Sequence, residues 1–226
     1  AAATDREQCV AREHQLVGIE HVADVARGMS WRFENTALQS ADLDLVTFAH
    51  RFVEEKRPDL ALRALEIINQ SYPNARMVFA GEHIIAYEDT WERQQALVQR
   101  YSEQLVFLGL IESPQELANF YAACDVLLLT SASECFALAQ VEAMLCGTPV
   151  VATNIPGGRV PVQVTGMGKI AHKGDWRSIG AAVVEVLNQP DRYYQPRETI
   201  ERIFSFKETV DRYEEFFYAY ARGSQA

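Results

Sequence analysis

Residues 126–146 read VLLLTSASECFALAQVEAMLC, and this stretch decides the fold class. A short apolar run, Val126 to Leu129, is followed by a polar turn and then by apolar residues at helical spacing as far as Cys146. Short runs of this kind are typical of buried strands, whereas the longer periodic segment is typical of a helix. The stretch therefore predicts a strand that leads through a turn into a helix.

The same alternation continues from about Asp44 onward. Six apolar runs are expected to form strands: Leu45 to Ala49, Met77 to Ala80, Leu105 to Leu108, Val126 to Leu129, Val150 to Thr153 and Gly168 to Ala171. Helical patterns lie near Pro58 to Gln70, Thr90 to Tyr101, Pro114 to Ala123, Phe136 to Cys146 and Trp176 to Leu187. This order predicts an α/β fold, a Rossmann-like doubly wound parallel sheet of about six strands with helices on both faces.

One globular domain is expected over residues 44–226, because the chain is long enough for one buried core and 48% of it is hydrophobic. Residues 1–43 form an N-terminal segment without an assigned role, partly helical near Arg6 to Arg27. At the other end, Phe206 to Ala221 predicts a terminal helix. Its aromatic residues recur at spacings of three and four and are expected to face the core: Tyr213, Phe216, Phe217 and Tyr220.

Composition narrows the classes of partner. The 21 Lys and Arg residues are outnumbered by 31 Asp and Glu, and no basic run occurs, so nucleic acid is not an expected partner. No apolar stretch approaches the roughly 20 residues of a membrane-spanning helix, and no secretory signal is visible. Four cysteines without metal-type spacing are expected to be reduced, buried thiols, which favours a cytoplasmic location: Cys9, Cys124, Cys135 and Cys146.

Ligands of such sheets bind at the carboxyl ends of the strands, where Glu134 lies. If the next helix begins near Cys135 or Phe136, its first free amides favour an anion such as a diphosphate. Glu142 lies eight residues after Glu134, or about 12 Å along a helix, so the two acids could take the donor sugar and the ribose. The alternative is that Glu134 caps the helix and Glu142 is an ordinary surface acid.

Two cations, Arg51 and Lys56, follow the first predicted strand. They are suited to neutralise a diphosphate, although pairing with nearby acids on a solvated loop is the alternative. The only Asp-x-Asp spacing, at residues 42–44, precedes this strand, so the sequence favours a mechanism without a metal. The lone histidines His83 and His172 are expected to be surface or packing residues rather than ligand contacts.

Taken together, these features resemble the donor-binding half of retaining GT-B glycosyltransferases, particularly glycosyltransferase family 4. The strongest element is the pattern of Glu134, seven residues, Glu142 and Ala-Met, followed by GTPVVAT at residues 147–153. Further matches are Arg51 with Lys56, Gly81, Phe107-Leu108-Gly109, Tyr121 to Asp125, and Pro156-Gly157-Gly158. The sequence departs from the family pattern at His50, Arg57 and Ala137, where Gly is usual, and at Val160, where an acid is often found.

The resemblance implies transfer of a hexosyl unit from a nucleotide sugar, with retention and with no cofactor besides this donor. By the resemblance, Arg51 and Lys56 hold the diphosphate, Glu134 the donor sugar and Glu142 the ribose. Backbone amides are implied to contact sugar and phosphates at Phe136, Ala137 and Leu138. The backbone after the second and third strands would frame the donor at Gly81, Gly109, Leu110 and Ile111.

In such enzymes an N-terminal acceptor-binding domain faces the donor-binding half, and only about forty residues precede the first predicted strand here. We therefore expect a chain that binds donor but is inactive alone. Two other classes remain open: a noncatalytic nucleotide-binding or scaffold domain, and a nucleotide-sugar epimerase. Measuring the binding of nucleoside diphosphates would separate a scaffold domain that has lost donor binding from an enzyme. Conversion of a free sugar nucleotide without acceptor would indicate an epimerase.

Overall fold

A computed structural model describes residues 43–223 and contains one six-stranded sheet, in which every neighbouring pair of strands is parallel. The strand order is β3-β2-β1-β4-β5-β6. The strands are β1 (Leu45–Phe48), β2 (Arg76–Ala80), β3 (Leu105–Gly109), β4 (Val126–Leu129), β5 (Val150–Thr153) and β6 (Gly168–Ala171). The predicted doubly wound sheet is confirmed, with every strand within one residue of its expected bounds.

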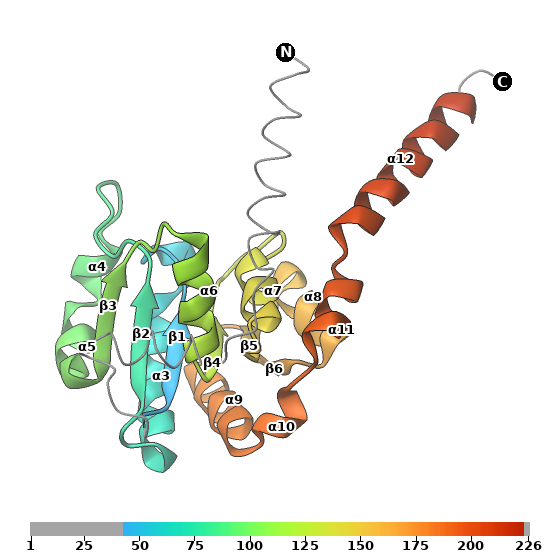
Figure 1. Cartoon of the computed structure of the whole chain (residues 1–226). Coiled ribbons are helices and arrows are strands. Elements are labelled where there is room, and N and C mark those ends of the chain that lie inside the picture. Colours follow the sequence, from blue (N-terminus) through green and yellow to red (C-terminus); the bar gives the residue numbers. More distant parts are fainter. Residues whose placement is uncertain (1–42, 224–226) are drawn as a thin grey trace.

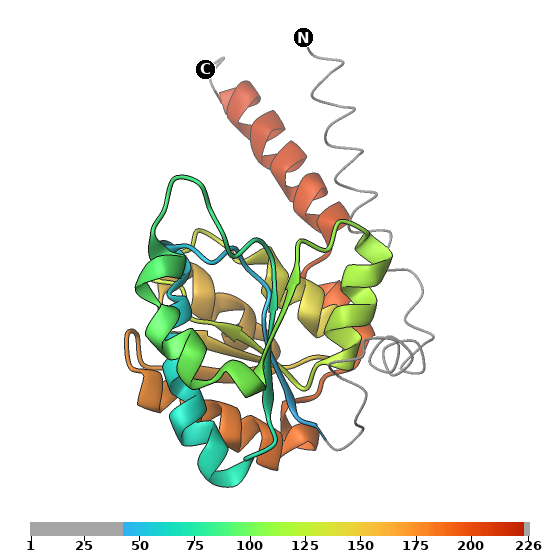
Figure 2. The ribbon, with the colours of Figure 1, turned by 90° about the vertical axis from the view of Figure 1, so that its left-hand side faces the viewer.

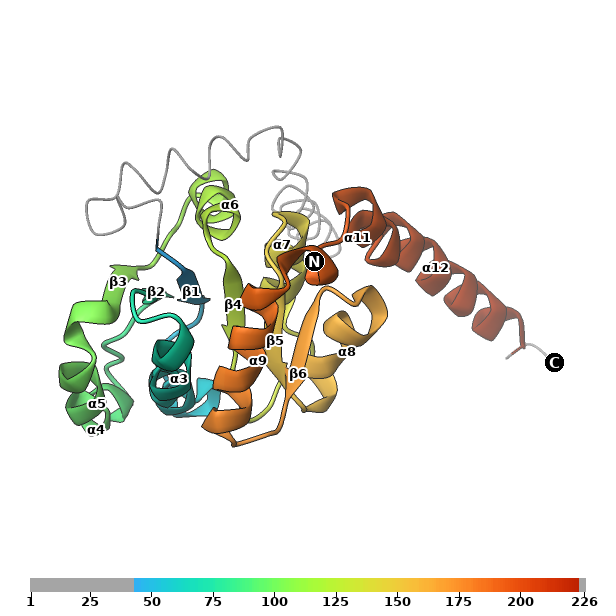
Figure 3. The same ribbon diagram turned by 90° about the horizontal axis from the view of Figure 1, so that it is seen from below.

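Helices cover both faces of the sheet (Figures 1 and 3). One face carries α3 (Pro58–Ser71) and α9 (Trp176–Asn188), which pack tightly because a Cβ at Gly180 would meet the side chain of Ile67. The other carries α6 (Pro114–Ala123), α7 (Leu138–Leu145), α8 (Pro156–Thr165) and α11 (Arg197–Ile203). Short elements complete the domain: η2 (Glu54–Lys56), α4 (Thr90–Arg93), α5 (Gln95–Arg100), η3 (Ser102–Gln104) and α10 (Pro190–Tyr193).

The apolar strands separate two hydrophobic cores. Val46 and Phe48 of β1 belong to the core beneath α3 and α9, whereas Leu45 belongs to the core beneath α6 and α7. Successive strand residues point to opposite faces, so a strand buried on both faces must be apolar throughout. The polar side chains of interest therefore lie in the loops that follow the strands, at the carboxyl edge of the sheet.

Several helical segments differ from expectation, and α10 and α11 were not expected. The helix expected over Thr90 to Tyr101 is divided at Gln94 into α4 and α5. In contrast, α8 was not expected, because two glycines and Pro161 weaken its helical signal. Pro156 stands in its first turn, where the missing N–H costs nothing, and Gly166 ends it in the left-handed conformation.

The terminal helix exists, but its aromatic stripe does not face the core of the described domain. Helix α12 (Phe206–Gly223) projects from the body of the molecule in Figure 2. The four stripe residues are between 61% and 70% exposed: Tyr213, Phe216, Phe217 and Tyr220. The expected core packing is therefore wrong for residues 43–223, because the spacing fixes one apolar face of a helix but not what covers it.

The cysteine prediction is confirmed at two positions. Cys124 and Cys146 are buried free thiols, whereas Cys135 is free and exposed, since it lies in the loop before α7 rather than in a helix. The expectation of a buried thiol is therefore wrong for Cys135. Cys9 and the helical pattern of residues 6–27 lie outside the described residues.

Candidate functional site

The centre of the carboxyl edge holds an ion pair between Lys56 and Glu134. Lys56 ends η2, which follows β1, and Glu134 lies in the loop that follows β4. The Lys56 Nζ atom lies 2.5 Å from Glu134 Oε1, and the two side chains are only 18% and 12% exposed. The hydroxyl of Ser131 donates a second hydrogen bond to the same carboxylate oxygen at 2.8 Å. We call this arrangement the Lys56–Glu134 corner.

Backbone contacts fix the two loops of the corner to each other. The Thr130 hydroxyl donates to the carbonyls of Lys56 and Arg57, at 2.7 and 3.0 Å, and the Ala132 amide donates to the carbonyl of Glu55 at 2.8 Å. Thr130 is buried, so these partners satisfy groups that water does not reach. The loops after β1 and β4 are therefore joined beneath the ion pair.

Helix α8 supports the corner from the other side. A Cβ added at Gly157 would collide with the backbone carbonyls of Glu134 and Cys135. A glycine at this position lets the first turn of α8 touch the loop that carries Glu134. The glycine pair noted in the sequence thus contributes close packing to the site.

His50 lies at the end of β1, near the corner. Its Nε2 atom is buried without a hydrogen-bond partner, and its ring packs edge-on against Phe48 at 5.5 Å between centroids. The pKa of His50 is lowered to about 4, mainly by burial and in smaller part by the charge of Lys56, while the charge of Glu134 acts in the opposite direction. A neutral imidazole thus occupies the position where the family pattern has Gly.

The glycines of the neighbouring loops bring three strand ends together. Gly81 follows β2 with a φ of +137°, and a Cβ there would lie 2.5 Å from the His50 carbonyl oxygen. Its amide donates to the carbonyl of Gly109, which ends β3, at 2.7 Å. Side chains larger than hydrogen are excluded at Gly81, so the loops after β1, β2 and β3 approach closely.

Arg51 does not join the ion pair. Its side chain is exposed, and its Nη1 atom donates to the Tyr87 hydroxyl at 2.7 Å. Tyr87 belongs to the loop between β2 and α4, which also carries the exposed side chain of Ile84. The two cations that the sequence placed at one anion site are therefore held by different partners in the free chain.

The turn before α7 differs from the prediction. The helix begins at Leu138 rather than near Cys135 or Phe136, because Ala137 is extended, with φ −84° and ψ 93°. The amides of Phe136 and Ala137 therefore belong to the preceding loop, and that of Leu138 opens the helix. Ala137 is buried, whereas the Phe136 and Leu138 side chains are 41% and 56% exposed.

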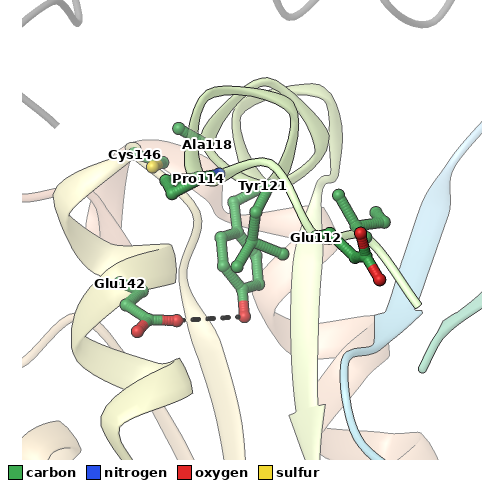
Figure 4. A pocket seen from close by; sticks show the side chains of 8 residues that line it. Glu112, Pro114, Ala118, Tyr121, Glu142 and Cys146 are labelled. Carbon is green, nitrogen blue, oxygen red and sulfur yellow. Dashed lines mark hydrogen bonds between the residues drawn. The ribbon is translucent and has the colours of Figure 1, made fainter. Parts of the chain in front are cut away.

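Glu142 lines a pocket between α6 and α7, shown in Figure 4. Its cavity has a volume of about 190 Å³ and is lined by Ile111, Glu112, Pro114, Leu117, Ala118, Tyr121, Glu142 and Cys146. The Tyr121 hydroxyl donates to Glu142 Oε2 at 3.5 Å. We call this arrangement the Glu142 pocket.

Burial controls protonation in this pocket. It raises the pKa of Glu142, and the hydrogen bond from Tyr121 opposes the rise by favouring the charged carboxylate. Burial also raises the pKa of the Cys146 thiol to about 12, against the opposing charge of Arg197. Cys146 is therefore a protonated, unreactive thiol at neutral pH.

Comparison with known families decides the identity of this fold. A model described as glycosyl transferases group 1 matches residues 31–202, more than half of the chain. The chain belongs to this family. Its sheet matches one Rossmann-like half of a GT-B glycosyltransferase.

Among relatives of this glycosyltransferase domain, a D-inositol 3-phosphate glycosyltransferase from Mycolicibacterium smegmatis is 34% identical over 177 residues, covering 75% of the chain and 39% of the relative. A namesake from Thermobispora bispora is 29% identical, over 67% of the chain and 37% of the relative. The chain thus spans about two fifths of the length of these relatives.

Solved structures show the same fold. HepE from Anabaena, in complex with UDP and glucose, superposes with a TM-score of 0.74 at 20% identity, covering 86% of this chain and 52% of HepE. The C-terminal domain of a glycosyl transferase group 1 family protein from Francisella tularensis superposes with a TM-score of 0.62 at 20% identity. This match covers 71% of the present chain and 85% of that domain.

Within the glycosyltransferase domain, the predicted site residues fall into separate groups. Lys56 contacts Glu134, while Ile111 lines the same pocket as Glu142. Gly109 lies at the end of β3, and Leu110 follows it with a side chain that is 60% exposed. Arg51 is not among the residues that line the Glu142 pocket.

Three polar residues of this edge were missed as site residues: Ser131, Tyr87 and Tyr121. Ser131 could have been found, because a hydroxyl directly after an apolar strand lies at the ligand edge. Tyr121 was noted only as part of a motif. Its contact with Glu142 depends on how α6 and α7 face each other, which sequence spacing does not determine.

The remaining candidates behave as packing or surface groups. His83 packs against the rings of Trp91 and Phe107, with centroids 4.8 and 5.1 Å away, whereas His172 is exposed. Within residues 43–223, no cluster of three His, Cys, Asp or Glu residues could hold a metal ion. Over the same residues, no helix is long and apolar enough to cross a membrane.

Proposed function

We propose that this domain is the donor-binding half of a retaining glycosyltransferase of family 4, which transfers a hexosyl unit from a nucleotide sugar to an acceptor. The Lys56–Glu134 corner is the observation that carries the proposal. The strand order reverses between β1 and β4, and in open α/β sheets ligands bind outside the carboxyl ends of the strands at such a switch point. Lys56 follows β1 and Glu134 follows β4, so a cation and a carboxylate flank this crevice.

In the proposed reaction, the bond between the anomeric carbon and the diphosphate oxygen breaks, and the diphosphate leaves with the electron pair. Lys56 and Arg51 neutralise the charge that develops on this leaving group, a role that a metal ion plays in other transferases. Glu134 accepts hydrogen bonds from donor-sugar hydroxyls and stabilises the positive charge on the sugar ring. The acceptor oxygen then bonds to the anomeric carbon on the same face and gives its proton to the departing diphosphate.

Binding of donor exchanges partners at the corner. Lys56 and Glu134 neutralise each other in the free chain, so the diphosphate competes for Lys56 while sugar hydroxyls take over part of the Glu134 carboxylate. Arg51 leaves Tyr87 to reach the phosphates, and its exposed side chain allows this movement. Each new contact replaces an existing one, so no buried charge is left unpaired.

The nucleoside occupies the Glu142 pocket in this proposal. Glu142 accepts from the ribose hydroxyls, and the backbone near Gly81, Gly109, Leu110 and Ile111 frames the phosphates and the base. Amides in the turn before α7, at Phe136, Ala137 and Leu138, contact the sugar and phosphates. The complex of HepE with UDP and glucose supports a nucleotide sugar as the ligand class.

The acceptor half is proposed to be a separate N-terminal domain. The relatives are more than twice as long as the matched region, which supports a second domain. We further propose that the reaction needs no metal and takes place in the cytoplasm. The isolated chain then binds donor without turning it over.

Calorimetry with UDP, GDP and ADP tests the proposal. At least one nucleotide should bind, and Lys56→Ala should weaken it by about five- to a hundredfold, the range for a hydrogen bond to a charged group. Lys173→Ala, at an exposed lysine beyond β6, is the matched control and should bind as the unmodified chain does. Absence of binding to all three would contradict the proposal and favour a scaffold domain. Conversion of a free sugar nucleotide by the chain alone would favour an epimerase.

A further inference from the structure

Tyr121 is placed to control the carboxylate of Glu142. It lies on α6, and its hydroxyl points across the pocket toward Glu142 on α7, as Figure 4 shows. Its side chain is 2% exposed and packs beside the ring of Phe120, at 5.6 Å between centroids. The backbone at Tyr121 is also held, because its carbonyl accepts from the buried Thr148 hydroxyl at 2.5 Å. The phenol therefore approaches Glu142 from a fixed position.

The surroundings of Glu142 make this hydrogen bond important. Burial disfavours the charged carboxylate, and Tyr121 supplies the only side-chain hydrogen bond found for it among the described residues. The other titratable groups near it do not neutralise its charge. Cys146, directly after the end of α7, is a protonated thiol. Arg197 of α11 acts on Cys146, and Glu112 lines the pocket with a like charge.

We propose that Tyr121 is a positioning residue, which holds Glu142 Oε2 so that Oε1 faces the pocket to accept from the ribose hydroxyls. This inference rests on the proposed function, because it needs a ribose at Glu142. A tyrosine suits this task because a buried ring has only two side-chain torsions, so little freedom is lost on ligand binding.

The phenol also remains a donor under all working conditions. Burial raises the pKa of Tyr121 well above its ordinary range, and the nearby charge of Glu142 raises it further. The hydroxyl therefore keeps its proton while Glu142 is ionised. A hydrogen bond to the charged form favours that form, so removing it should leave a carboxylate that protonates more readily.

The test measures UDP and 2′,3′-dideoxy-UDP binding to the full chain and to Tyr121→Phe. The variant should bind UDP about three- to tenfold more weakly, as expected for part of one charge-assisted hydrogen bond, and should bind the dideoxy ligand as before. Tyr193→Phe is the matched control, since its hydroxyl donates to the carboxylate of Glu185 at 2.6 Å. This control should change neither affinity.

A double-mutant cycle keeps the inference testable if Tyr121→Phe also lowers stability. In the Glu142→Ala background, Tyr121→Phe should have no further effect on UDP affinity, because the residue acts through Glu142. The pH dependence gives a second readout. As the pH falls, UDP binding should weaken in both proteins, but it should begin to weaken at a higher pH in Tyr121→Phe. The reason is that the pKa of Glu142 rises further without the phenol.

The outcomes separate this inference from the proposed function. If the unmodified chain prefers UDP over the dideoxy ligand and Glu142→Ala abolishes that preference, Glu142 holds the ribose. Tyr121→Phe must then reduce the preference and shift the pH midpoint, and unchanged values would overturn the positioning role alone. Equal weakening of both ligands would mean that Tyr121 is structural. Failure of the unmodified chain to bind any nucleotide would overturn both proposals.

Discussion

The Lys56–Glu134 corner and the Glu142 pocket lie on the same domain but hold their carboxylates in opposite ways. At the corner, Glu134 is 12% exposed and is paired with Lys56 and Ser131. In the pocket, Glu142 forms no ion pair with any of the residues 43–223, and its hydrogen-bond donor is the neutral phenol of Tyr121. Lys56 therefore neutralises the charge of Glu134, whereas no cation of the described residues pairs with Glu142.

This difference indicates what each place can bind. A paired cation can exchange its carboxylate for a phosphate, because both are anions whose oxygens accept charge-assisted hydrogen bonds from an ammonium group. A desolvated carboxylate without a cation is suited to neutral hydroxyl donors, which satisfy its oxygens and leave the charge unchanged. Ligand binding at the corner should therefore depend on salt concentration, and ligand binding in the pocket on the ionisation of Glu142.

The largest expected effect comes from breaking the support of the corner with Gly157→Ala. The new Cβ would overlap the Glu134 and Cys135 carbonyls, which are backbone atoms and must shift together. We expect a loss of about 3 kcal/mol in the free energy of unfolding, at the upper end for an added methyl group. Urea denaturation measures this loss.

Gly174→Ala is the control for this prediction. The φ of +74° at Gly174 is strained for alanine, but no atom lies within 4 Å of the added Cβ, so this variant should cost only about 1 kcal/mol. Equal losses would show that α8 does not support the corner.

A second prediction concerns His50, which gives the corner its own pH dependence. Its pKa of about 4 lies below the ordinary value of 6.5, so its contribution to stability is present above pH 6.5 and is lost as the pH falls toward 4. A shift of this size corresponds to about 3 kcal/mol. His50→Phe should flatten the decline in unfolding free energy over this window, while His172→Phe, at an exposed site, should not. An unchanged slope in His50→Phe would contradict the prediction.

The smallest effect is expected from Glu142→Gln, which sharpens the contrast from the side of the pocket. Because burial raises the pKa of Glu142, its charge costs stability once the pH exceeds that pKa, and the cost is absent below the ordinary range of a glutamate. The variant should be more stable than the unmodified chain at neutral pH and equally stable near pH 4. Thermal unfolding at both pH values measures this. A loss of stability at neutral pH would show that the carboxylate is needed structurally.

Much of the fold could be predicted because a strand that is buried on both faces is apolar throughout, and such runs can be recognised in the sequence. Strand β4 has the bounds expected for the run at Val126 to Leu129, and the periodic residues after it form α7, although this helix begins at Leu138 rather than near Phe136. Helix α8 was missed because its glycines and Pro161 serve packing rather than helix propensity, and Gly157 shows why: it touches the Glu134 loop. The aromatic stripe of α12 was misjudged because amphipathic spacing does not say what covers a face.

The site could be predicted only in part. Lys56 and Glu134 follow adjacent strands of the sheet, so their meeting follows from topology and needs no knowledge of side-chain packing. Arg51 could not be assigned in this way, because its partner Tyr87 lies in a loop whose course the sequence does not specify. Tyr121 was missed as a partner of Glu142 for a similar reason, since the rotation of α6 against α7 sets that contact.

The most direct test of the account compares UDP affinity in Lys56→Ala and Glu142→Ala at low and high salt. Loss of either contact should cost about 1 to 3 kcal/mol at low salt, or about five- to over a hundredfold in affinity. The loss of UDP affinity in Lys56→Ala should be smaller at high salt, because salt screens the attraction between Lys56 and the diphosphate. The Debye length falls from about 10 Å at 0.1 M to about 3 Å at 1 M. The loss of affinity in Glu142→Ala should persist at high salt, and it should be absent when 2′,3′-dideoxy-UDP replaces UDP. Equal salt dependence in the two variants, or a Glu142→Ala deficit that remains with the dideoxy ligand, would contradict the division of the site into a diphosphate corner and a ribose pocket.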